Sequence, residues 1–147
     1  MLAMLIVAQA VLYVEDSEST ETIAEAVVVR AETVSQARRV ASDAALRSTF
    51  ALCSDADIRA LKEVAFDSSY MSDVGRIQDD HLLCSALWGR IVPFKLPAPH
   101  YSSGDTKLWN TSDLVGSPYG GTNLIAQGRT FTVSSPSSFD GLDPART

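Results

Sequence analysis

The stretch YMSDVGRIQDDHLLCSALWGRI, residues 70–91, predicts a β-hairpin in the middle of the chain. Two mostly apolar runs flank the polar tetrapeptide QDDH, which we interpret as a four-residue turn. Under strict alternation, one face of the second strand carries Leu82, Cys84, Ala86 and Trp88, and the other carries Leu83, Ser85 and Leu87. Because both faces are largely apolar, we predict a central strand in which Cys84 is buried.

Two helices are predicted before this hairpin. Residues 17–49 contain neither Gly nor Pro, and their apolar stripe recurs at spacings of four and seven, at Ile23, Val27, Val34 and Ala41. A helix of that length would extend on the order of 50 Å, like a stalk. A shorter helix is predicted over residues 55–66, because Ser54 can cap its N-terminus and Asp57 stands three residues further on.

The part of the chain after the hairpin predicts less regular structure. Residues 93–121 are rich in Pro, Gly, Ser and Asn, which favours long loops or edge pieces over regular core, and a last strand is predicted over residues 129–133. Aromatic residues in ordered loops often line a ligand pocket, here Tyr101, Trp109 and Tyr119. We therefore predict an α+β fold, with a long N-terminal helix and a short helix packed on a small antiparallel sheet of PAS or Cache type.

Length and charge limit the classes of function. A chain of 147 residues is the size of one domain, and its 46% hydrophobic content is ordinary for a globular protein. The net charge of -6, with scattered Lys and Arg, argues against a nucleic acid partner, because that binding depends on neutralising phosphates.

The first fourteen residues, MLAMLIVAQAVLYV, carry no charge and set the N-terminus apart from residues 15–147. A membrane-spanning helix needs about 20 apolar residues, so this segment is predicted to be part of a transmembrane helix or the remnant of an export signal. A plain core segment is the remaining alternative. Either of the first two interpretations places the chain from Glu15 onward outside the cytoplasm.

The two cysteines, Cys53 and Cys84, are candidates for a disulfide, which an oxidising compartment would form and keep. A cross-link over this separation would stabilise the fold by roughly 3.6 kcal/mol in the chain-entropy description. Two unpaired buried thiols are the alternative. With His81 and His100, the cysteines lack the spacing of zinc sites, so no metal is expected. No catalytic motif and no cofactor-binding motif is found.

Three stretches, CSDADIRALKEVAF at 53–66, SSYMSDVGRI at 68–77 and HLLCSALWGR at 81–90, together resemble the CSS-motif domain. This family consists of sensors at the N-terminus of bacterial membrane-bound cyclic di-GMP phosphodiesterases with EAL catalytic domains. The Cys-Ser-Ser box is matched by Cys84, Ser85 and Ala86, so the third residue departs from the family pattern. The matching segments are in order and extend over most of the chain.

The resemblance implies a redox sensor in the periplasm, anchored at the bacterial inner membrane by its N-terminal segment. Its Cys53–Cys84 disulfide would restrain the phosphodiesterase, and periplasmic thiol-disulfide oxidoreductases would be its partners. No EAL motif is present, so we expect a truncated sensor that is not catalytic by itself. A homodimer through the long helix is a further expectation. The alternative function is a small-ligand sensor of Cache or PAS type, with the aromatic pocket and a purely structural disulfide.

Overall fold

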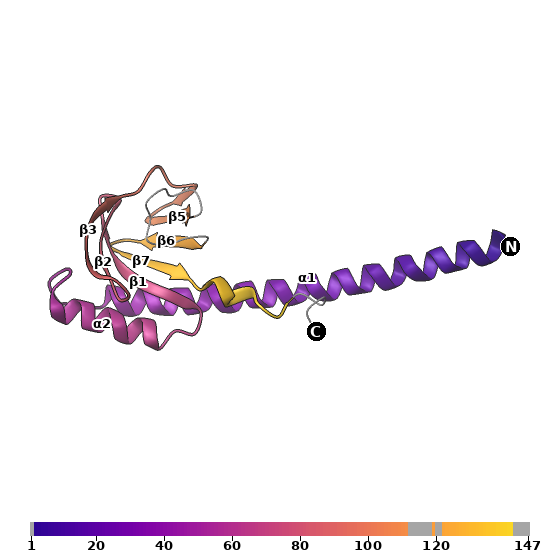
Figure 1. The fold of residues 1–147 in the computed structure, drawn as a ribbon, viewed down its shortest axis with the longest axis horizontal. Helices are drawn as coiled ribbons and strands as arrows, with labels where there is room; N and C mark the ends of the chain where they lie inside the picture. Colours follow the sequence, from indigo (N-terminus) through magenta and orange to yellow (C-terminus); the bar gives the residue numbers. More distant parts are fainter. Residues whose placement is uncertain (1, 112–118, 120–121, 143–147) are drawn as a thin grey trace. The chain divides into compact units, whose positions relative to one another are not determined.

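The computed structural model describes residues 2–111, 119 and 122–142, and their side chains from residue 20 onward. The chain divides into two compact units, one formed by residues 34–138 and the other by residues 1–33 with 139–147. Helix α1, Leu2–Leu46, contributes residues to both units. All the sites described below lie in the unit formed by residues 34–138 (Figure 1).

Two α-helices contribute to this larger unit, the last turns of α1 and helix α2, Asp55–Phe66, and a short 3-10 helix, Pro136–Phe139, lies at its C-terminal boundary. The bounds predicted for α2 are confirmed, and so is its cap, because the Ser54 hydroxyl oxygen accepts a hydrogen bond from the Asp57 backbone N–H at 3.2 Å. In α1, the predicted stripe is buried at Val34 and Ala41. These two residues pack against Ile58 and Leu61 of α2 and against the sheet.

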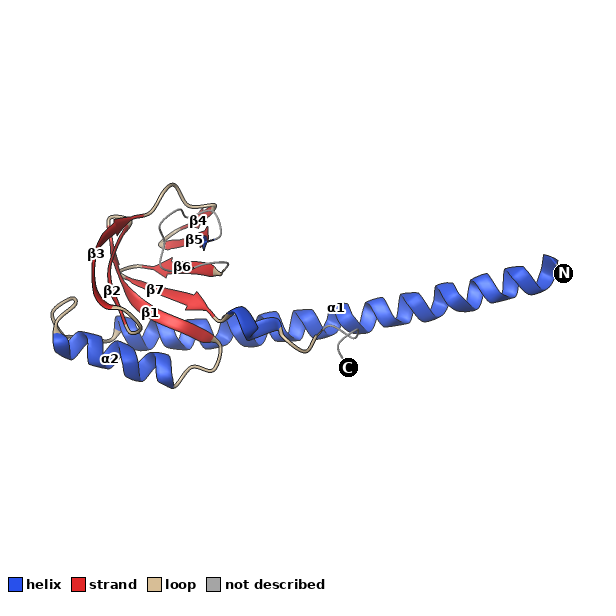
Figure 2. Cartoon of the chain, viewed as in Figure 1, coloured by secondary structure: helices blue, strands red, loops and turns tan. Residues whose placement is uncertain are grey.

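Seven strands form one antiparallel sheet, which confirms the α+β class but is larger than the three strands predicted. The strands are β1 Met71–Gln78, β2 His81–Ser85, β3 Gly89–Lys95, β4 Tyr101–Ser103, β5 Thr106–Asn110, β6 Asn123–Gln127 and β7 Thr130–Ser134. Their order is β3-β2-β1-β7-β6-β5-β4, so β1 and β7 are central and β3 and β4 lie at the edges. Within this unit, both helices lie on one side of the sheet (Figure 2).

The two faces of the sheet carry separate hydrophobic clusters, and a bulge in β2 places neighbouring residues in different ones. Leu82 belongs to the cluster with Trp109 and Phe131, whereas Cys84 belongs to the cluster that includes both helices. The prediction that these two side chains share a face is wrong. Arg76 pairs with Cys84 while the next residue, Ile77, pairs with Leu82, so β2 contains one extra residue that reverses the alternation.

The predicted second strand of the hairpin is also shorter than expected. It ends at Ser85, and a turn at residues 86–88 leads into β3. The turn is held because the Ser85 hydroxyl accepts a hydrogen bond from the Trp88 N–H at 3.1 Å, and Gly89 follows with a φ of 67°. Trp88, which strict alternation placed on the same face as Cys84, is therefore 51% exposed. The preceding turn contains two residues, Asp79 and Asp80, both with positive φ.

Of the two alternatives predicted for residues 93–121, edge pieces describe much of the described range better than long loops. Strand β3 continues to Lys95, and β4 and β5 form a hairpin in which Gly104 adopts a φ of 59°. Pro93 is compatible with β3 because an edge strand does not need every N–H for pairing. Strand β6 was not predicted, while the last strand, predicted from residue 129 to 133, is confirmed as β7.

The described side chains of the smaller unit come from α1 and residues 139–142. Three consecutive valines, Val27 to Val29, are between 40% and 62% exposed. None of the helices, over the part of the chain that is described, has the length and apolar character needed to cross a membrane. The predicted membrane or export segment, residues 1–14, lies outside the residues whose side chains are described.

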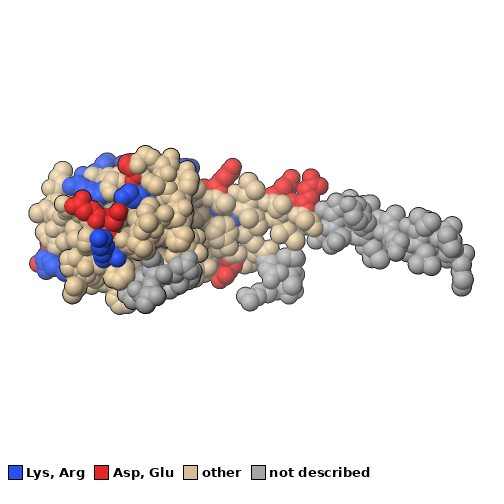
Figure 3. Space-filling view, turned by 90° about the horizontal axis from the view of Figure 1, so that it is seen from above, with Lys and Arg blue, Asp and Glu red and all other residues tan. Residues whose placement is uncertain are grey.

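On the face shown in Figure 3, Lys and Arg lie beside Asp and Glu instead of forming a separate patch.

Candidate functional site

The centre of the candidate site is a disulfide between Cys53 and Cys84. It joins the connection between α1 and α2 to strand β2, across 31 positions of sequence. The two Cα atoms are 5.8 Å apart, within the range of roughly 4.4–6.8 Å that disulfides require. The predicted disulfide is therefore present, and the alternative of two unpaired thiols is contradicted.

Cys53 lies in a backbone conformation that L residues rarely adopt, with a φ of 58°. Two hydrogen bonds hold it there besides the disulfide. Its N–H donates to Asp57 Oδ2 at 3.0 Å, and its carbonyl oxygen accepts from Arg90 Nε at 3.0 Å. Arg90 also pairs with Asp55 at 2.7 Å on the surface. Cys53 is half-buried and Cys84 is fully buried, so the two halves of the disulfide differ in access to solvent.

A buried ion pair lies directly beside the disulfide. The guanidinium of Arg76 contacts the carboxylate of Asp57 through two bonds, Nη2 to Oδ1 at 2.5 Å and Nε to Oδ2 at 2.9 Å. The two side chains are 1% and 0% exposed. Such a two-point contact is among the strongest hydrogen-bonded arrangements of charged groups. Arg76 is also the β1 residue that pairs with Cys84 in the sheet.

The remaining donors and acceptors of this pair reach α1, the connection that follows it, and β7. Arg76 Nη1 donates to the carbonyl of Ala45 in the last turn of α1 and to Thr130 Oγ1 in β7, both at 3.0 Å. Asp57 Oδ1 accepts a further bond from Ser48 Oγ at 3.1 Å. The pair therefore connects the end of α1, the start of α2, β1 and β7 at the place where the disulfide enters the core.

The pKa of Asp57 reflects this environment. Burial by itself would raise it, but the hydrogen bonds from Arg76, Cys53 and Ser48, together with the Arg76 charge, hold the pKa of Asp57 below its ordinary value. Asp57 is therefore ionised at neutral pH. An ionised, fully buried carboxylate is tolerated only because its partners stay in place, so the site depends on its own geometry.

A second buried carboxylate, Asp73, holds the segment that follows Cys84. Its Oδ1 accepts from the Leu87 N–H at 2.9 Å, and its Oδ2 accepts from the Tyr119 hydroxyl at 2.6 Å. Burial and the neighbouring Asp73 carboxylate raise the pKa of Tyr119, which keeps the phenol protonated as a donor. Ser85 is fully buried, and Ala86 is buried in the helix-side cluster with its N–H bonded to the Val74 carbonyl at 2.8 Å.

Gly75 lies in β1, between Asp73 and Arg76 in the sequence. A Cβ atom at this position would overlap the Cys84 carbonyl oxygen and the Phe131 ring. The close approach of β1 to its neighbours at the disulfide therefore requires glycine.

The family model described as CSS motif domain associated with EAL matches residues 16–147. The chain belongs to the CSS-motif family. No curated protein and no solved structure matches the chain. Each residue of the box has a different role in this CSS-motif domain. Cys84 forms the disulfide, the Ser85 hydroxyl bonds to the following turn, and Ala86 packs in the core.

The three aromatic residues predicted to form a pocket lie in different environments. Trp109 is fully buried and donates from Nε1 to the Pro97 carbonyl at 2.9 Å. Tyr119 packs edge-to-face on Phe131 in the same cluster, whereas Tyr101 is 59% exposed. None of the three lines either cavity described below. An aromatic pocket in this CSS-motif domain stays a prediction.

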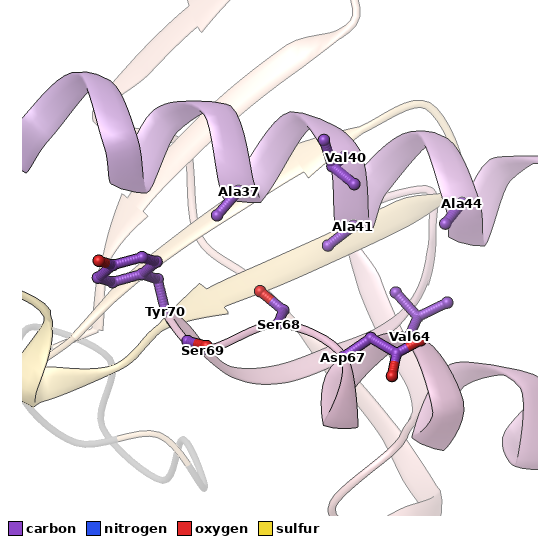
Figure 4. Close-up of a pocket in the computed structure, with 9 residues that line it drawn as sticks. All are labelled: Ala37, Val40, Ala41, Ala44, Val64, Asp67, Ser68, Ser69 and Tyr70. Carbon is purple, nitrogen blue, oxygen red and sulfur yellow. The ribbon is translucent and has the colours of Figure 1, made fainter.

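Described residues elsewhere in the domain line two cavities. The larger, about 350 Å³, lies between α1 and the segment that leads from α2 to β1 (Figure 4). The smaller, about 150 Å³, lies at the β1–β2 and β4–β5 turns, where Lys107 pairs with Asp80 at 2.6 Å. Over the described residues, no group of three or more His, Cys, Asp or Glu side chains could hold a metal ion. His81 and His100 each bond to backbone atoms nearby.

Sequence reasoning missed both buried carboxylates of this CSS-motif domain. Asp57 was interpreted as a helix-capping residue, and Arg76 received no role. One signal was present: Val74 and Arg76 alternate onto the same face of β1, so a charged residue stood where an apolar one was expected. A charge on a buried face indicates a buried partner, but it does not say which residue that partner is.

Proposed function

We propose that this domain is a redox sensor that regulates a cyclic di-GMP phosphodiesterase through the Cys53–Cys84 disulfide. In this proposal the domain lies in the periplasm, is held at the inner membrane by its N-terminal segment, and does not hydrolyse the nucleotide itself. Its membership of a family associated with EAL supports the link to phosphodiesterases. The observation that carries the redox part is the disulfide that holds Cys53 at a φ of 58° beside a buried ion pair.

The proposed chemistry is thiol-disulfide exchange with a dithiol oxidoreductase of the periplasm. A thiolate of the reductant attacks one sulfur, the bond between the two cysteine sulfurs breaks, and the other cysteine leaves as a thiolate that takes up a proton. The second thiol of the reductant then releases the mixed disulfide. Two electrons and two protons pass to the domain, which gains two thiols while the reductant gains a disulfide.

Reduction would change the conformation for a physical reason. A residue other than glycine in the left-handed region costs on the order of 1–3 kcal/mol, so Cys53 can gain stability by relaxing once the covalent restraint is gone. Relaxation would move the Cys53 N–H away from Asp57, which bonds to Arg76 and through it to the Ala45 carbonyl. The end of α1 would then respond to the state of the disulfide, and the oxidised form would be the restraining one.

Hydrogen exchange in the oxidised and reduced chain tests the conformational step. We expect faster exchange in residues 42–57 after reduction, with protection retained in β6 and β7. The matched control is the Cys53→Ser/Cys84→Ser variant, which should match the reduced chain with or without reductant. Identical exchange in the two redox states, or two titratable thiols after air oxidation of the folded chain, would contradict the proposal.

The regulatory step requires a catalytic domain. The full 147-residue chain, which keeps the N-terminal segment, would be joined to the N-terminus of an EAL phosphodiesterase, and hydrolysis of cyclic di-GMP by membranes that contain the fusion would be measured in both redox states. We expect higher activity after reduction and in the double serine variant. Activity that is independent of the disulfide would refute the regulatory role.

A further inference from the structure

The larger cavity is a groove with the dimensions of a small-molecule site. Its volume of about 350 Å³ falls at the lower end of the range of roughly 300–1,000 Å³ that is typical of ligand pockets. One wall is the side of α1 that faces the α2–β1 connection, and the other is the end of α2 with the residues that follow it (Figure 4). The apolar part of the lining consists of small aliphatic side chains, Ala37, Val40, Ala41, Ala44 and Val64.

A buried hydroxyl faces this apolar wall. Ser68 Oγ has almost no contact with solvent, and it has no hydrogen-bond partner within the described part of the chain. Figure 4 shows the Ser68 side chain pointing toward α1, across the groove from the alanines. Buried hydroxyl groups are nearly always paired, because an unpaired one has lost its hydrogen bonds to water without replacement. Because water does not reach Ser68 Oγ, a ligand in the groove does not bond to it in this conformation, and the polar contact of an occupant must come from the rim.

The charge at the rim selects the sign of that polar group. Asp67 is the one carboxylate among the lining residues, which include no Lys, Arg or His, and it is also the C-cap of α2. The last turn of α2 contains no basic residue, so the partial negative charge of the helix end adds to that of the carboxylate. The whole chain carries a net charge of -6 as well. A cationic group is therefore favoured at the rim, and an anionic one is disfavoured.

We infer that the groove binds a small amphipathic amine, with its apolar body against the alanines of α1 and its protonated nitrogen at the Asp67 carboxylate. An ammonium group has three donors and no acceptor, so it can donate to this carboxylate and keep its other hydrogen bonds to water at the rim. The occupant would contact α1 and the α2–β1 connection at once and would strengthen their packing. This binding does not depend on the redox proposal, because neither cysteine lines the groove.

Three probes with the same six-carbon body test the inference: hexylammonium, hexanol and hexanoate, titrated calorimetrically into the full 147-residue chain at low ionic strength. We expect hexylammonium to bind with a submillimolar to low millimolar dissociation constant, hexanol to bind at least threefold more weakly, and hexanoate at least tenfold more weakly. Asp67→Asn should reduce the affinity for hexylammonium to that for hexanol. Asp105→Asn makes the same charge change at another cavity and should alter the affinity less than twofold.

A second pair of variants tests the location. Ala37→Leu fills the groove and should abolish binding of all three probes, whereas Ala24→Leu, at an exposed position of the same helix, should not. Circular dichroism melting verifies that each variant is folded. The inference is overturned if hexylammonium does not bind at 10 mM, if hexanoate binds equally well, if Asp67→Asn has no effect, or if folded Ala37→Leu binds like the parent chain.

Discussion

Replacing Arg76 by Met would remove the charge that compensates buried Asp57 and should be strongly destabilising. Met keeps much of the side-chain volume, so the loss reports the charge interaction more than a cavity. Asp57 would keep its bonds from Cys53 and Ser48 but lose both bonds from the guanidinium. The Ala45 carbonyl would also lose the donor that Arg76 supplies. Breaking a buried pair typically costs about 3–5 kcal/mol, and the two remaining donors place the expected loss near the lower end.

The assay is urea unfolding of the oxidised chain at pH 7, followed by circular dichroism without reductant. A loss of about 3 kcal/mol would lower the melting temperature by roughly 10 °C in a domain of this size. Asp57→Asn should lower the free energy of unfolding by a similar amount. The double variant should be at least about 2 kcal/mol more stable than the sum of the two single losses predicts, because its buried site carries no uncompensated charge. Arg90→Met is the matched control, since Arg90 is 62% exposed and its pair should contribute at most about 1 kcal/mol.

Two results would refute this reasoning. If Arg76→Met loses no more stability than Arg90→Met, the buried pair does not hold the site together. If the losses of the two single variants add fully in the double variant, the two side chains are not energetically coupled, despite the contacts between them.

Four further predictions concern the same region. The pKa of Asp57 is lowered on folding, so the unfolded chain takes up the proton first as pH falls. The stability advantage of the parent chain over Asp57→Asn should therefore shrink as pH falls from the ordinary pKa, about 3.9, to the lower folded value. A difference in urea midpoints that stays constant over this range would contradict the prediction. Gly75→Ala should cost about 3 kcal/mol in urea unfolding, because its Cβ has no space. With Cys84→Ser as background, Cys53→Gly should be about 1 kcal/mol more stable than Cys53→Ala, because glycine accepts the positive φ; equal melting temperatures would count against strain at this residue. In single-cysteine variants of the folded chain, half-buried Cys53 should react with a thiol reagent at least tenfold faster than buried Cys84, and equal rates would show that a reductant has no preferred sulfur.

Local features of the structure were predictable because neighbouring residues decide them. The bounds of α2 follow from the Ser54 cap and the Asp67-Ser68-Ser69 break after Phe66. The β1–β2 hairpin follows from two apolar runs around a polar turn, and the Cys53–Cys84 pairing follows from the number of cysteines and the family pattern. The strands of residues 93–121 were missed because edge strands with Pro, Ser and Lys do not show the alternation of a half-buried strand.

The sequence by itself thus determined the helices, the hairpin, the α+β class and the two sulfurs that meet. Only the tertiary structure decided that the bulge in β2 turns Cys84 and Leu82 to opposite faces, that Arg76 meets Asp57, and that a groove opens beside Ser68. The physical reason is the range of the interactions. Caps, turns and periodicity act within a few residues, whereas the partner of a buried charge depends on which segments the whole fold brings together, here 19 positions apart for Arg76 and Asp57.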